Sequence, residues 1–148
     1  MAKGKIFCYV LDKTEIVKDY ISRCTNYANT EILQISDIQV GLSILPSVET
    51  WLAYIRDCDL VITDSFHGTV FSIIMNKPFV VVANGSRGIA RFVDLLQRFG
   101  LKNRIVSQKN SPESILGRTI DWEVVNKKIE LQRQESFNFI KENFKKDV

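Results

Sequence analysis

A chain of 148 residues, of which 45% are hydrophobic and 25% charged, is long enough for one globular domain with a sizeable core. It has no apolar run near the roughly 18 residues of a membrane-spanning helix, and the apolar segment after Met1–Lys5 is too short for a signal peptide, so we expect a cytoplasmic protein. One histidine and three isolated cysteines exclude a Cys/His zinc cluster and give no disulfide framework.

The net charge of +3 is unevenly distributed. Residues 1–84 carry 7 Lys and Arg against 9 Asp and Glu, whereas residues 85–148 carry 13 against 8. Basic residues are not interleaved with aromatic ones as in many nucleic-acid readers, so this pattern favours a small anionic ligand over nucleic acid. The arginines that carry this interpretation follow Asn84: Arg87, Arg91, Arg98 and Arg104.

Apolar runs alternate with helical patterns from the start of the chain. Nearly continuous apolar runs, typical of strands buried on both faces of a sheet, predict strands at residues 6–11, 31–35, 60–63 and 79–83. Residues 40–45 could add another short strand. Helical spacing predicts a helix of about three turns from Ile16, one at 48–55 capped by Ser47, and a buried one at 69–75.

The second half of the chain continues the same alternation. A helix is predicted from Gly88 to Phe99, ended by Gly100, then a short strand at 104–106. Together these elements predict an α/β fold with a Rossmann-like, doubly wound parallel sheet of about five to six strands. We expect residues 1–120 to form this domain. Residues 121–148 should form a long helix whose apolar stripes pack on the domain, on a partner domain or on another subunit.

The segment Asp64–Thr69 holds the only histidine, His67, where a strand gives way to a helix. At the carboxyl edge of a parallel sheet, such a turn directs helix N–H groups at a ligand, and an imidazole there can transfer protons. Alternatively, His67 only packs in the turn, and Asp64 or Ser65 caps the helix. If residues 40–45 form a strand, residues 60–63 form the fourth, beside the first at the switch point where ligands bind.

The run from Cys58 to Thr69, Cys-Asp-Leu-Val-Ile-Thr-Asp-Ser-Phe-His-Gly-Thr, resembles the signature of the polysaccharide pyruvyl transferase family. Asn76–Phe79 and, less specifically, residues 91–106 extend the resemblance to about residues 5–106. The family is similar to two-domain glycosyltransferases of the GT-B type, and this chain resembles its carboxyl-terminal, donor-binding half. The resemblance implies transfer of an enolpyruvyl group from phosphoenolpyruvate to a diol of a cell-surface glycan, forming a pyruvate ketal. It implies no metal or cofactor, and a place at the inner membrane surface through glycan-assembly partners.

The same resemblance gives His67 the role of the general acid that protonates the methylene carbon of phosphoenolpyruvate. The two anionic groups of this donor need anchors. The backbone N–H groups of Gly68 and Thr69 could hold one, and Arg87 and Arg91, at the next strand-to-helix junction, could hold the other. Arg91 could instead form a surface pair with Asp94.

Two positions depart from the expected pattern. In the family that this motif resembles, some members have the sequence Arg-Leu-His-Gly at these four positions. In this chain the first two of the four positions are Ser65 and Phe66. Ser65 can hydrogen-bond an anion but cannot neutralise it, so Arg87 or Arg91 compensates or the donor binds in another geometry. Asp64 either caps the helix or accepts a proton from the acceptor hydroxyl.

Two other functions stay open at this point. One is a glycosyltransferase half that binds a sugar nucleotide, although residues 85–92 carry two arginines and no acid that could hold a ribose. The other is a non-catalytic module that pairs with another chain through its terminal helix.

Overall fold

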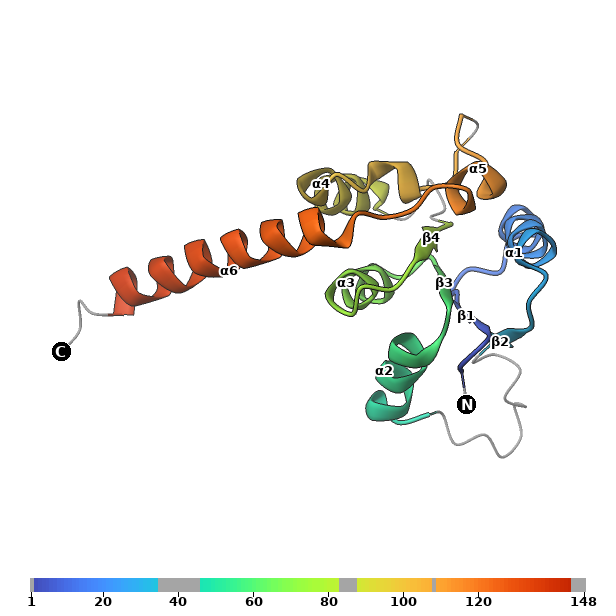
Figure 1. The fold of residues 1–148 in the computed structure, drawn as a ribbon, viewed down its shortest axis with the longest axis horizontal. Helices are drawn as coiled ribbons and strands as arrows, with labels where there is room; N and C mark the ends of the chain where they lie inside the picture. The colour runs from blue at the N-terminus through green and yellow to red at the C-terminus, as the bar shows by residue number, and fades with distance from the viewer. Residues whose placement is uncertain (1, 35–45, 83–87, 108, 145–148) are drawn as a thin grey trace.

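A parallel sheet of four strands organises the chain in the computed structural model, which describes residues 2–34, 46–82, 88–107 and 109–144 (Figure 1). Its order is β2–β1–β3–β4, and all three pairings are parallel. The strands are β1 (Ile6–Tyr9), β2 (Ile32–Gln34), β3 (Leu60–Thr63) and β4 (Phe79–Val81). The predicted α/β class is therefore confirmed.

The predicted number of strands is confirmed only in part. Residues 40–45 lie outside the described residues. The strand expected at 104–106 is reduced to an isolated parallel bridge between Val81 and Ile105, with one further hydrogen bond from the Val106 N–H to the Val81 carbonyl (2.9 Å). A 3₁₀ helix, η2 (Lys102–Arg104), precedes it. The extended segment is therefore shorter than predicted, and the side chain of Arg104, the last residue of η2, turns inward.

Helices cover both faces of the sheet (Figure 1). On one face α2 (Val48–Asp57), α3 (Phe66–Ile74) and α4 (Ile89–Phe99) pack over Phe7, Val61 and Phe79. On the other, α1 (Glu15–Ala28) and α5 (Pro112–Leu116) pack over Ile6 and Ile62. Neighbouring strand residues thus enter different cores, which explains the continuous apolar runs.

Helix ends follow the expected capping chemistry. Ser47 caps α2 by accepting a hydrogen bond from the Thr50 N–H (3.3 Å), and Gly100 ends α4 in the left-handed region at φ 75°. The predicted start of α3 is wrong, because the helix begins at Phe66 and not at Thr69. His67 therefore lies inside the first helical turn.

The last helix, α6 (Trp122–Phe144), confirms the predicted long helix over the described part of residues 121–148 and extends away from the domain (Figure 1). Val125 is buried against the core beside α4, whereas apolar side chains further along are exposed: Leu131, Phe137, Phe139, Ile140 and Phe144. None of the helices in the described ranges combines the length and apolar composition that a membrane crossing requires.

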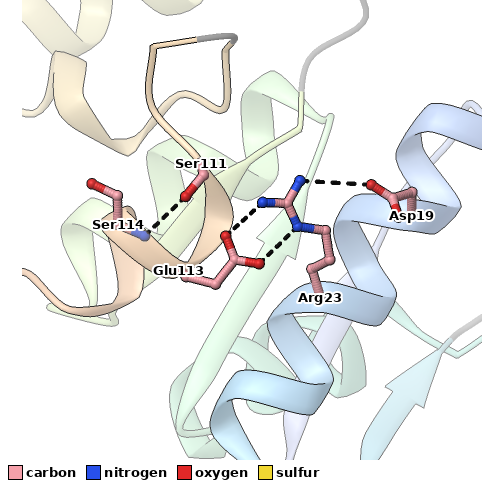
Figure 2. A network of polar contacts seen from close by, with 5 residues as sticks. All are labelled: Asp19, Arg23, Ser111, Glu113 and Ser114. Atoms are coloured by element: carbon pink, nitrogen blue, oxygen red, sulfur yellow. Dashed lines mark hydrogen bonds and ion pairs between the residues drawn. The ribbon is translucent and has the colours of Figure 1, made fainter.

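The short helix α5 was not predicted, although Ser111 followed by Pro112 is a common helix start. A bidentate ion pair holds it to α1 (Figure 2): Arg23 Nε and Nη2 each donate to a Glu113 carboxylate oxygen at 2.7 Å. The hydrogen bonds from Arg23, aided by the Glu113 backbone N–H and Ser111, lower the pKa of Glu113 from 4.5 to about 2.

This pair should make folding acid-sensitive. The folded pKa of Glu113 is depressed, so its stabilisation is present above pH 4.5 and is lost as the pH falls through about 2. Glu113→Gln should therefore destabilise the protein at neutral pH and progressively less towards pH 2 in urea unfolding. Glu142→Gln, the same change at an exposed position of α6, should leave the pH profile as in the wild type. A Glu113→Gln deficit that does not shrink with acid would contradict this account.

Candidate functional site

The turn between β3 and α3 lies at the switch point of the sheet. From β1 the chain moves outward to β2, then crosses over to β3 on the other side of β1. In such sheets, ligands bind beyond the carboxyl ends of the two strands where the direction of winding changes. His67 follows β3 directly and lies at this edge, as predicted, although β3 is reached as the third described strand.

Short hydrogen bonds join the ends of these two strands. The Thr63 hydroxyl donates to the Tyr9 carbonyl at 2.6 Å and accepts from the Ser65 N–H at 3.0 Å. Asp64 accepts from the N–H groups of Leu11 and Asp12, one on each carboxylate oxygen, at 2.8 Å. Asp64 therefore holds the loop after β1 and does not cap α3.

Ser65 is the cap of α3. Its hydroxyl accepts from the Gly68 N–H at 3.3 Å, and its carbonyl accepts from the Thr69 N–H at 3.0 Å. The N–H groups of Gly68 and Thr69, which the sequence suggested as anion donors, are thus already hydrogen-bonded to Ser65 within the turn. Among the described residues no hydrogen bond from the N–H groups of Phe66 and His67 is found, so these are the first-turn donors left for a ligand.

Gly68 is required by packing between helix and strand. A Cβ at this position would lie 2.6 Å from Thr63 Oγ1 and 3.3 Å from Thr63 Cβ. Thr63 is fully buried and fixed by its two hydrogen bonds, so it cannot move aside easily. The glycine thus lets α3 approach β3, whereas the sequence suggested that it lets a ligand approach.

Gly68→Ala should lower the free energy of unfolding by about 1–3 kcal/mol, since α3 must retreat from β3. Gly117→Ala is a matched control, because its Cβ would meet its nearest neighbour at 3.4 Å, in ordinary contact. The control should change stability by less than about 1 kcal/mol in urea unfolding. Equal effects of the two substitutions would show that the contact with Thr63 is not the cause.

His67 is exposed and borders a cavity of about 430 Å³. The His67 side chain is thus open to solvent, while Ser65 is the cap that the alternative interpretation named. The wall of the cavity comes from the end of β1, the start and first turn of α2, and α3; the other described lining residues are Tyr9, Pro46, Val48, Trp51, Ser65 and Phe71. The three aromatic residues were not among the predicted site residues, because each lies in a pattern equally typical of core.

Arg91 comes to this site from the next strand-to-helix junction. It lies in the first turn of α4, with its guanidinium carbon 5.6 Å from the centroid of the Phe66 ring. The Phe66 ring in turn meets the His67 ring edge to face at 6.2 Å. Asp94, the alternative partner of Arg91, pairs with Arg98 at 3.0 Å. Arg87 lies outside the described residues.

The three cysteines are not among the described residues that line the cavity. Cys8, Cys24 and Cys58 are buried and form no disulfide, and burial raises the pKa of Cys24 to about 12 and that of Cys58 to about 11. Thiols with such values are poor nucleophiles at neutral pH. In the described ranges no group of three His, Cys, Asp or Glu side chains could hold a metal ion.

Comparisons with known proteins agree with the motif. The family model of the polysaccharide pyruvyl transferases matches residues 4–86, more than half of the chain and all of β1 to β4. Neither the comparison with curated proteins nor that with solved structures finds a match. With the His67 turn inside the matched segment, the chain belongs to the polysaccharide pyruvyl transferase family.

Proposed function

We propose that this chain is the donor-binding half of a pyruvyl transferase that moves an enolpyruvyl group from phosphoenolpyruvate to a sugar diol of a polysaccharide. The observation that carries this proposal is an exposed His67 in the first turn of α3, at the switch point, with Arg91 beside it across Phe66. Family membership supplies the reaction class.

The chemistry needs an acid beside the enol. A proton from the His67 imidazolium adds to the methylene carbon, and the first sugar hydroxyl bonds to the neighbouring carbon while its own proton returns to the imidazole. Phosphate then leaves with the electrons of its C–O bond. The second hydroxyl closes the ring on the same carbon and its proton passes to the released phosphate, so the products are a pyruvate ketal and inorganic hydrogen phosphate.

Two anchors are at hand for the anionic donor. The N–H groups of Phe66 and His67, at the positive end of α3, suit one anionic group. The Arg91 guanidinium suits the other and would supply the charge that Ser65 lacks. Both carboxylate oxygens of Asp64 accept N–H groups of the loop after β1, so we assign Asp64 to holding that loop.

Titration with phosphoenolpyruvate tests the donor site, because His67 is the only histidine and its ring signals are unambiguous by nuclear magnetic resonance. We expect saturable shifts at millimolar donor. Arg91→Gln should weaken binding about ten- to a hundredfold, as expected for a charge-assisted hydrogen bond. Arg98→Gln, seven residues along the same helix, is the matched control and should bind as the wild type.

Other outcomes point to the other functions. No response to millimolar phosphoenolpyruvate would contradict the donor site. Shifts caused by a sugar nucleotide instead would favour a glycosyltransferase half. Silence to both in a stable dimer would favour a non-catalytic module that pairs through the exposed apolar part of α6, the surface on which a partner domain or second copy would pack.

A further inference from the structure

The cavity beside His67 has a composition unlike that expected for phosphoenolpyruvate. Its described lining is aromatic and aliphatic, with the hydroxyls of Tyr9 and Ser65 and the imidazole of His67 as the polar groups. None of these described lining residues is Lys or Arg. Against this described lining, a donor carrying a phosphate and a carboxylate would lose part of its hydration and meet no cationic side chain, which is costly.

His67 lines this cavity and its ring also meets Phe66, on which Arg91 stacks. Trp51 and Phe71 lie in the cavity wall, whereas Arg91 stacks on Phe66, the neighbour of His67. The arrangement thus offers an aromatic compartment and an anion-binding surface that share one imidazole. A reaction between an anionic donor and an uncharged acceptor needs two such compartments.

The aromatic wall is rigidly built. Trp51 meets Tyr9 edge to face at 5.3 Å and Phe71 at 5.6 Å, with interplanar angles of 69° and 89°. Mutually perpendicular rings hold one another in place and present both faces and edges to an occupant. The C–H groups on a pyranose ring carry small positive charges and lie well against the negative face of an aromatic ring.

Trp51 also favours an occupant with hydroxyl groups. Its indole N–H is buried and has no hydrogen-bond acceptor in the described part of the chain. A buried donor of this kind calls for a partner, which an occupant with hydroxyl groups could supply. A hydrocarbon chain would fill the same space but could not accept this hydrogen bond.

From these observations we infer that the cavity is an acceptor subsite that holds an uncharged pyranose ring against Tyr9, Trp51 and Phe71, with its reacting hydroxyls towards His67. The inference rests on the proposed function, since the ring is the diol that receives the enolpyruvyl group. A volume of about 430 Å³ lies within the range of about 300–1,000 Å³ in which proteins bind small molecules.

The two tryptophans give a direct test with an internal control. The full chain is titrated with methyl β-D-galactopyranoside, methyl α-D-mannopyranoside and the methyl glycoside of N-acetylglucosamine, following both indole N–H signals. At least one glycoside should shift the Trp51 signal saturably at millimolar concentration. The signal of Trp122, which is not among the lining residues, should stay in place.

A pair of charge variants identifies the kind of occupant. Val48 lines the cavity and is 69% exposed, so Val48→Glu and Val48→Lys should both fold. For an uncharged sugar the two variants should bind within about twofold of each other, because there is no net charge to attract or repel. Phosphoenolpyruvate shifting Trp51, with tighter binding to the lysine variant, would overturn the inference in favour of an anion in this cavity.

The remaining outcomes are equally decisive. If no glycoside moves Trp51 at tens of millimolar while phosphoenolpyruvate still shifts His67, the subsite is wrong and the donor site stands. If a glycoside moves Trp51 and phosphoenolpyruvate is silent, the subsite stands and the proposed donor fails. If n-octanol moves Trp51 and the glycosides do not, the cavity takes an apolar chain and the inference is overturned.

Discussion

Replacing His67 by glutamine should lower the rate of pyruvyl transfer by about two to four orders of magnitude, the range that general acid catalysis contributes. Glutamine keeps a side-chain N–H that can hydrogen-bond an anion, but it cannot give up a proton. Binding of phosphoenolpyruvate should therefore change only a few-fold. Because His67 is exposed, the variant should unfold at the same urea concentration as the wild type.

Two measurements separate proton transfer from binding. Phosphate release from phosphoenolpyruvate with a methyl glycoside reports the complete reaction. Exchange of the methylene hydrogens of phosphoenolpyruvate with deuterium from the solvent needs only the donor and the acid, so it suits a chain assigned to the donor half. A His67→Gln variant with wild-type rates would show that the acid lies elsewhere, and one that loses donor binding alone would make His67 an anion anchor.

The elements formed by local chemistry could be predicted from the sequence. Apolar runs gave the four strands because both faces of a parallel sheet are buried, and the cap at Ser47 and the stop at Gly100 depend on residues one to three positions away. The prediction that His67 lies at the switch point counted a further strand at residues 40–45, which lie outside the described residues; in the described sheet β3 nevertheless pairs directly with β1.

The details of the site depend on contacts between distant residues, which no local pattern contains. Glycine disfavours a helix, which argues for a start of α3 after Gly68. The close approach of α3 to Thr63 of β3, which only glycine allows, outweighs this helix propensity. Asp64 resembled a helix cap, but its partners are the N–H groups of Leu11 and Asp12, more than fifty residues earlier. A local pattern could not choose between these partners.

The arginines show the same limit of sequence reasoning. Four of them after Asn84 suggested one anion site. Of the three in described segments, Arg91 lies at the candidate site, Arg98 pairs with Asp94 on the surface of α4, and Arg104 is buried at 2% exposure. Composition gives the charge of a segment, but only packing decides which charges face a ligand.

Arg104→Met should lower the free energy of unfolding by about 3–5 kcal/mol, because the buried guanidinium is the donor for three carbonyl groups. Its Nε donates to the Phe79 carbonyl, and Nη1 donates to those of Ile115 and Arg118, all at 2.9 Å. Burial lowers the pKa of Arg104 to about 10, so it remains charged at neutral pH. Methionine fills similar space but leaves the carbonyls without this donor.

The size of this loss decides between two opposing effects. Burying a cation costs free energy, so an apolar replacement can be neutral when the group's partners are also removed. Here the partners are backbone carbonyls of β4, α5 and the turn after it, and they stay buried in the variant. Arg98→Met, at an exposed ion pair, should cost less than about 1 kcal/mol. If Arg104→Met were equally mild in urea unfolding, the desolvation cost of the charge would equal the three hydrogen bonds, and the Arg23–Glu113 pair would remain as the polar link that holds α5 to the domain.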